Sequence, residues 1–166
     1  MQRHTTLAFV ILLFTSTHLA AAEQRSDEFI RDAIEGNLFE IKAGELAQSK
    51  GERPTVREFG AMLAKDHAQA RSKSEQAAKA IGAKVPTTPS ETQRALLNTL
   101  SKLNGDAFDT RFIQAMHDDH LRDIARYETQ SKQGTDAVAK YATETLPTLR
   151  DHLKAVQGLQ NERATQ

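Results

Sequence analysis

Residues 59–75 read FGAMLAKDHAQARSKSE, and residues 112–128 read FIQAMHDDHLRDIARYE. Both stretches begin with phenylalanine, place an Asp-His pair at their eighth and ninth positions and end with glutamate. Neither contains proline, and both are rich in alanine, leucine, arginine and other residues that favour helix. The repeat therefore predicts a duplicated helical hairpin whose histidines point toward a shared axis.

Glycine and proline divide the rest of the chain into helical segments. β-branched alternation is absent, so we expect each long segment to be helical. Ser26 and Thr135 are candidate N-caps, Pro54 opens a helix, and Ser90 with Gln93 forms a capping-box pattern. The expected helices span residues 26–49, 54–82, 90–105, 106–132 and 135–158.

Two short turns and one long connection decide the expected topology. Turns near Gly51 and Gly134 make the helices on either side of each turn antiparallel. The connection from Gly82 to Asp106 holds a helix of about 15 residues, which at about 1.5 Å per residue carries the chain back along the bundle. This order predicts an all-α, ferritin-like antiparallel four-helix bundle with one long crossover that contains a short extra helix. Pro147 is expected to kink the last helix or mark a local irregularity.

The first 22 residues have the order of a secretory signal peptide. A short basic start precedes an apolar run over residues 7–14, and three alanines at positions 20–22 precede Glu23. The apolar run is shorter than the about 20 residues of a membrane-spanning helix. We expect cleavage after about Ala22, which leaves one exported domain over residues 23–166, periplasmic or secreted, with no transmembrane segment.

Composition narrows the functions that the mature chain can have. The sequence contains no cysteine, which excludes disulfides and thiolate ligands. Without Arg3, 21 basic side chains face 22 acidic ones and form no basic tract, so no nucleic-acid partner is expected. No serine or cysteine nucleophile stands beside the histidines, which argues against an enzyme. A homo-oligomer and other partners are left open.

Each of the four long helices carries one polar residue inside its apolar arc. These residues are Glu40, His67, His120 and His152. The first three are expected at similar heights along the bundle axis. His152 is expected about one helical turn, or about 5 Å, away along that axis. A carboxylate with three imidazoles suits zinc, iron or copper, so the four residues are candidate ligands of a divalent metal.

Four further residues are secondary candidates for the metal: Asp66, His117, Asp119 and Asp123. Adjacent helical residues diverge by about 100°, so Asp66 cannot share a metal with His67. We expect it to hydrogen-bond a histidine of a neighbouring helix instead. His117 lies at the edge of its arc, and Asp123 follows His120 by three residues on the same side.

A set of short motifs resembles a known family. In chain order the motifs are Phe39-Glu40-Ile41, Gly44-Glu45-Leu46-Ala47, Val56 to Phe59, Asp66-His67, Phe108-Asp109, Met116 with Asp119-His120, and Leu146-Pro147 with His152-Leu153. They resemble those of the bacterial exported family known as domain of unknown function 4142. The resemblance implies a ferritin-like bundle and a periplasmic or outward location, with no established reaction.

The ligand pattern of ferritin-like di-iron proteins is absent. Those sites take Glu-x-x-His from two helices. The residues three before the candidate histidines are Ala64, His117 and Leu149. Ferroxidase, oxygenase and peroxidase activities are therefore not expected, and no catalytic residue is assigned.

The sequence leaves two functions open. In the first, an exported bundle binds metal through its central Glu/His layer for metal handling or stress protection. In the second, a non-enzymatic structural or partner-binding bundle uses the same buried layer only to fix packing, with the histidines bonded to one another, to Glu40 or to Tyr127.

Overall fold

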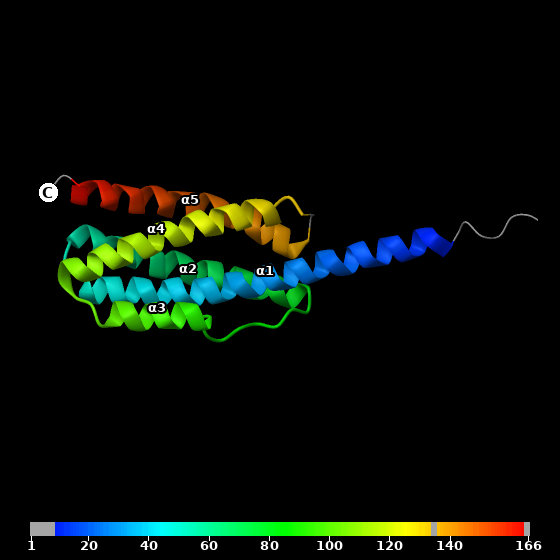
Figure 1. Cartoon of the computed structure of the whole chain (residues 1–166), viewed down its shortest axis with the longest axis horizontal. Coiled ribbons are helices and arrows are strands. Elements are labelled where there is room, and N and C mark those ends of the chain that lie inside the picture. The colour runs from blue at the N-terminus through cyan, green and yellow to red at the C-terminus, as the bar shows by residue number, and fades with distance from the viewer. Residues whose placement is uncertain (1–8, 134–135, 165–166) are drawn as a thin grey trace, which may run out of the picture.

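The computed structural model describes residues 9–133 and 136–164, with side chains for residues 24–133 and 136–162. Within these residues the chain forms five α-helices and no strand (Figure 1). The helices are α1 (Phe9–Lys50), α2 (Pro54–Ala80), α3 (Glu91–Ser101), α4 (Gly105–Gln130) and α5 (Ala137–Ala164). None of the helices in the described part of the chain is long and apolar enough to span a membrane.

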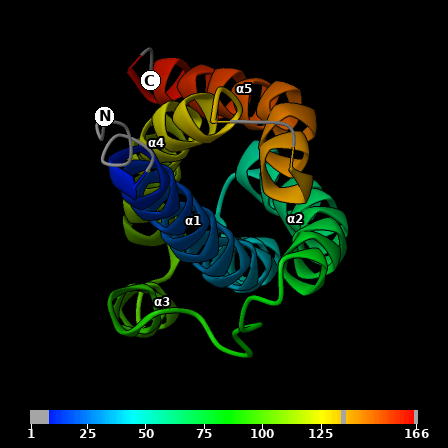
Figure 2. The same cartoon turned by 90° about the vertical axis from the view of Figure 1, so that its right-hand side faces the viewer.

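The four long helices pack side by side, and the short α3 lies outside them against α1 (Figures 1 and 2). Helix α1 runs antiparallel to α2, and α4 runs antiparallel to α5. The connection through α3 returns along α1, so α2 and α4 run in the same direction. This is the one-crossover topology of ferritin-like bundles, and the predicted fold class is confirmed.

Helix α1 begins much earlier than expected. It starts at Phe9 and continues through Ser26, so the prediction that Ser26 caps it is wrong. No glycine or proline interrupts residues 9–25, and nothing there stops the helix. The Ser26 hydroxyl instead donates to Asp136 at 3.3 Å and accepts from Gln130 at 3.2 Å, which ties α1 to the ends of α4 and α5.

The other boundaries agree more closely with the sequence. Pro54 opens α2, and Ser90 with Gln93 forms both bonds of the capping box at α3. The predicted Thr135 cap lies outside the described residues. Helix α5 begins at Ala137, where the Asp136 carboxylate accepts from the Ala139 amide at 2.7 Å.

Helix α5 contains Pro147, where a kink or a local irregularity was expected, and Gly158, where the helix was expected to end. It continues across Pro147, and it extends past Gly158 to Ala164. A single glycine near a helix end weakens the helix without stopping it. The predicted end near Gly158 is therefore wrong by about two turns.

Two glycines bring α1 and α2 into close contact. A Cβ atom at Gly44 would lie 2.5 Å from the Gly60 carbonyl oxygen and 2.9 Å from the Ala64 amide nitrogen. A Cβ atom at Gly60 would lie 2.6 Å from Ala47 Cβ. Only hydrogen fits at these two positions, so the two backbones approach closely. Glu40 lies one turn before Gly44 and is held near α2 by the same approach.

The buried apolar residues form two clusters with a polar layer between them. One cluster gathers around Phe39, Phe59, Phe112 and Val156, and the other gathers around Ile30, Ala78, Tyr127 and Leu149. On α2, α4 and α5, the residue at the change from one cluster to the other is a histidine. The fold thus places the candidate site in the middle of the bundle, enclosed by apolar residues at both ends.

Candidate metal centre

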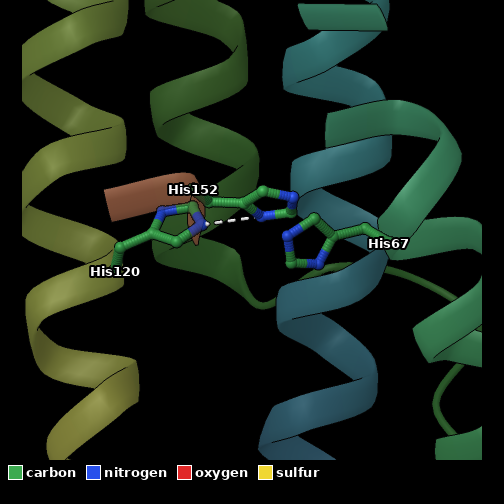
Figure 3. Close-up of side chains that lie close together, drawn as sticks. All are labelled: His67, His120 and His152. Atoms are coloured by element: carbon green, nitrogen blue, oxygen red, sulfur yellow. Dashed lines mark hydrogen bonds between the residues drawn. The ribbon is translucent and has the colours of Figure 1, made fainter. Parts of the chain in front are cut away.

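Three histidine rings meet in the polar layer (Figure 3). His67 comes from α2, His120 from α4 and His152 from α5. Their ring centroids lie 5.3 to 6.0 Å apart. One nitrogen of each ring lies within 4.8 Å of one nitrogen of each other ring. All three residues are at most 3% exposed, so three imidazoles from three helices surround one buried point.

The outer nitrogen of His67, which is the ring nitrogen that does not face the other two rings, lies next to two oxygen atoms on α1. His67 Nδ1 lies 2.9 Å from Asn37 Oδ1 and 2.8 Å from Glu40 Oε2. The Asn37 amide is oriented by its own donation to Ser74 at 3.3 Å and Tyr141 at 3.0 Å. His67 therefore carries its proton on Nδ1 and leaves Nε2 unprotonated. Among the described residues, Nε2 has no hydrogen-bond partner, and it faces the other two rings in Figure 3.

The other two rings form a row of contacts that ends on Asp66. His120 Nδ1 donates to the Met116 carbonyl at 2.9 Å, and His120 Nε2 lies 3.2 Å from His152 Nδ1. His152 Nε2 lies 3.1 Å from Asp66 Oδ2. A carbonyl and a carboxylate can only accept, so the three contacts need three protons. Two neutral imidazoles supply only two.

Burial disfavours the charged form of the histidine rings, so they do not readily take up the third proton. It lowers the pKa of His67 to about 4, and it also lowers the pKa of His120 and His152. The rings are consequently neutral at pH 7, which is the form in which imidazole binds metals.

Three carboxyl groups lie beside the histidines, on the α1 and α4 side. Glu40, Asp119 and Asp123 each place one oxygen within 4.8 Å of the others. Burial raises the pKa of Glu40 to about 8 and also raises the pKa of Asp119 and Asp123. Arg122 donates to Asp119 and opposes the increase there. Glu40 links the two groups, because its Oε2 lies 2.8 Å from His67 Nδ1 and its Oε1 lies 3.5 Å from His120 Nδ1.

The family model described as domain of unknown function (DUF4142) matches residues 14–159. The chain belongs to the DUF4142 family. A crystal structure of "putative secreted protein DUF305" from Streptomyces coelicolor resembles this DUF4142 chain with a TM-score of 0.71 and 15% sequence identity. The match covers 86% of this chain and 96% of that chain, and at such low identity it shows the fold alone. No curated protein matches the chain.

The DUF4142 bundle brings together the four residues predicted to point inward: Glu40, His67, His120 and His152. The ring of His152 lies 5.3 Å from each of the other two rings, so it reaches both of them from α5.

The secondary candidates divide between three places. Asp66 bonds His152 on a neighbouring helix, as expected. Asp119 and Asp123 join Glu40 in the carboxyl group of residues. His117 Nδ1 instead lies 3.2 Å from Asp118 Oδ1, outside both groups.

Asn37 is the site residue that the sequence reasoning missed. It is 3% exposed and lies three residues before Glu40, on the same side of α1. An asparagine within an apolar arc was the available signal, because a buried amide needs partners. Its partners on α2 and α5 could not be read from the sequence.

Proposed function

We propose that the mature chain is an exported bundle that holds one transition-metal ion between His67, His120 and His152. One observation carries this proposal: each ring has an oxygen acceptor beside its outer nitrogen and directs its inner nitrogen toward the other two rings. Histidines that bind metals usually donate their other N–H to a carboxylate or carbonyl, which fixes tautomer and ring orientation.

A bound cation would also resolve the shortage of protons. With a metal at the three inner nitrogens, His120 Nδ1–H still donates to Met116 and His152 Nε2–H donates to Asp66. The contact between His120 Nε2 and His152 Nδ1 then needs no proton, because both atoms give their lone pairs to the ion. The unpaired Nε2 of His67 supplies the third lone pair.

The ligand set narrows the choice of metal. Two nitrogens bound to one tetrahedral zinc at about 2.0 to 2.1 Å lie about 3.3 Å apart, and the His120 and His152 nitrogens already lie 3.2 Å apart. Neutral imidazoles without sulfur suit zinc, copper or iron. Glu40, which the sequence predicted as a fourth ligand, takes part here as the acceptor for His67 Nδ1.

Elemental analysis tests the proposal. Mature protein, residues 23–166, is purified without chelator or affinity metal, next to a His67→Ala/His120→Ala variant and a His117→Ala control. We expect about one metal ion per chain in the mature protein and in the control, and none in the double variant. A mature protein that remains free of metal after incubation with zinc, copper and iron would overturn the proposal.

A structural polar layer is the second candidate. The bond between His120 and His152 and the contact of His152 with Asp66 favour it, because they connect α4, α5 and α2 without a metal. This candidate expects full folding in the presence of chelator and no metal uptake at any pH.

The proposed compartment is the periplasm or the exterior of the cell. The basic start, apolar run and alanines within residues 1–22 support it, as does the secreted description of the Streptomyces protein. There the bundle would serve metal handling or stress protection. Cell fractionation and N-terminal sequencing check the location, and we expect the exported chain to begin at Glu23.

A further inference from the structure

The buried histidines are connected to the surface through Asp66. The His152 side chain is 1% exposed, whereas the Asp66 side chain that contacts it is 29% exposed. Asp66 also lines a cavity of about 120 Å³ between α2 and α5. The lining also includes Ala70 and Lys73 on α2, and Glu144, Thr145 and Thr148 on α5.

This α2–α5 cavity adjoins the histidine site through Asp66, which lines the cavity and contacts His152. Thr148 lies one helical turn before His152, so the two side chains share a face of α5. On the opposite wall, Asp66 Oδ2 lies 3.1 Å from His152 Nε2. An ion in the cavity that contacts Asp66 is thus one side chain away from the ring of His152.

We propose that the α2–α5 cavity is the access path to the histidine site, and that its cargo is a small, partly hydrated divalent cation taken up without a chelating carrier. The inference rests on the proposed metal binding. Asp66 attracts the ion into the cavity, and the ion then passes beside the His152 ring to the inner nitrogens, because Asp66 contacts the outer Nε2 of that ring.

The size and charge of the cavity support this cargo. At about 30 Å³ per water molecule, 120 Å³ holds about four waters. That space is large enough for a partly hydrated ion and small for a macrocycle or a large chelate. Asp66 and Glu144 contribute two carboxylates, Lys73 contributes one ammonium, and the ammonium of Lys140 lies 3.9 Å from Glu144. The threonine hydroxyls add oxygen donors, so the oxygen atoms that line the cavity favour hard or hydrated cations.

The opposite side of the bundle is less suitable for a cation. The Asp119 side chain there is only 14% exposed and is paired with Arg122. Arg126 adds a second guanidinium that acts on Asp119 and Asp123. Two fixed positive charges over the carboxyl groups oppose the approach of a metal ion.

Helix α5 is weakened at the wall of the cavity. Pro147 has no amide proton, so the bond that would join residue 147 to the carbonyl of Thr143 is missing. Thr145 and Thr148, on either side of this proline, line the cavity. The missing bond allows this wall to move more easily than an uninterrupted helix would.

A kinetic experiment separates the path from the site. To measure uptake, metal-free mature protein is mixed with Zn²⁺ in a stopped-flow instrument, with a fluorescent zinc chelator as reporter. To measure release, zinc-loaded protein is mixed with excess chelator. Ala70→Leu fills the cavity from α2, and Ala68→Leu makes the same change at an exposed position of the same helix. Thr148→Leu fills the cavity from α5 and replaces the first variant if that one does not fold by circular dichroism.

We expect each cavity-filling variant to slow uptake and release together by roughly tenfold or more, since displacing a packed leucine costs about 1.4 kcal/mol or more. The equilibrium affinity should stay close to that of the unmodified protein, and Ala68→Leu should leave both rates unchanged. Unchanged rates in the cavity-filling variant that folds would overturn the access path while leaving the metal site intact. A failure of the unmodified protein to bind zinc, copper or iron would instead overturn the proposed function.

Discussion

The position of one proton on His67 decides what its ring can bind. Asn37 Oδ1 and Glu40 Oε2 both lie within 3 Å of Nδ1, which keeps the proton there and leaves Nε2 free to bind a metal. Asp66 accepts the Nε2 proton of His152 in the same way, and the Met116 carbonyl accepts the Nδ1 proton of His120. The acceptors of His67 and His152 lie on other helices, whereas the Met116 carbonyl belongs to the same helix as His120.

Removal of one acceptor is expected to weaken metal binding without abolishing it. Asp66→Ala leaves the His152 ring in place and removes the acceptor of Nε2–H, which we expect to lower the affinity about 10- to 100-fold. Titration against a competing zinc chelator measures the change at equilibrium. Asp151→Ala removes the exposed aspartate next to His152 and should have no effect. Equal affinities for Asp66→Ala and the unmodified protein would contradict the assigned role.

The pKa values of Glu40 and His67 move in opposite directions, so their effects on stability oppose each other. Burial raises the pKa of Glu40 from 4.5 to about 8, so its stabilising contribution is full below pH 4.5 and disappears as the pH rises toward 8. Burial lowers the pKa of His67 from 6.5 to about 4, so its contribution is present above pH 6.5 and disappears as the pH falls toward 4.

Between pH 6.5 and about 8 only Glu40 of this pair titrates, so the metal-free protein should lose stability as the pH rises. Glu40→Gln is expected to reduce that loss, because the amide does not titrate. Urea unfolding at pH 6.5 and pH 8 measures the difference. The exposed Glu45→Gln change is the control, and the same pH dependence in both variants would rule out this role for Glu40.

At the scale of helices, the close contact of α1 and α2 sets the distance from Glu40 to His67. Gly44→Ala would place a methyl group 2.5 Å from the Gly60 carbonyl oxygen, and backbone atoms cannot rotate away. We expect a loss of about 1 to 3 kcal/mol or more in the free energy of unfolding. Gly158→Ala meets no atom within 4 Å in α5 and should gain about 0.5 to 1 kcal/mol instead. Chemical denaturation of both variants tests the pair, and a neutral Gly44→Ala would show that the helices can separate freely.

Local sequence signals predicted helix ends well where one residue decides the backbone. Pro54 and the Ser90 capping box are such cases, because a ring or a side-chain bond within one turn fixes the structure. Ser26 failed as a cap because the helix already runs through the residues before it, and its hydroxyl instead bonds residues that are about a hundred positions away in sequence. Periodicity showed which residues point inward, but the bonds of Asn37 and Asp66 cross between helices, and no local pattern contains them.

For the molecule as a whole, the polar layer separates two apolar clusters and joins helices that are distant in the chain. The helical arcs of the sequence were sufficient to predict this layer and its four residues. They could not show which ring nitrogens face inward, since that depends on outer acceptors contributed by three helices. Only the packed bundle shows that the contacts of His120 and His152 need one proton more than two neutral rings supply.

Metal removal should therefore affect the stability of the entire bundle. An ion held by His67, His120 and His152 joins α2, α4 and α5, and the unfolded chain offers no such arrangement. A ligand that binds only the folded state stabilises it by about 2.7 kcal/mol at 100 times its dissociation constant. We expect a higher Tm with metal than with chelator, measured by circular dichroism, and loss of that difference in His120→Ala. His117→Ala, on the same helix, should keep the difference because its ring lies outside the site. A metal-dependent Tm in His120→Ala as well would place the bound ion elsewhere on the molecule.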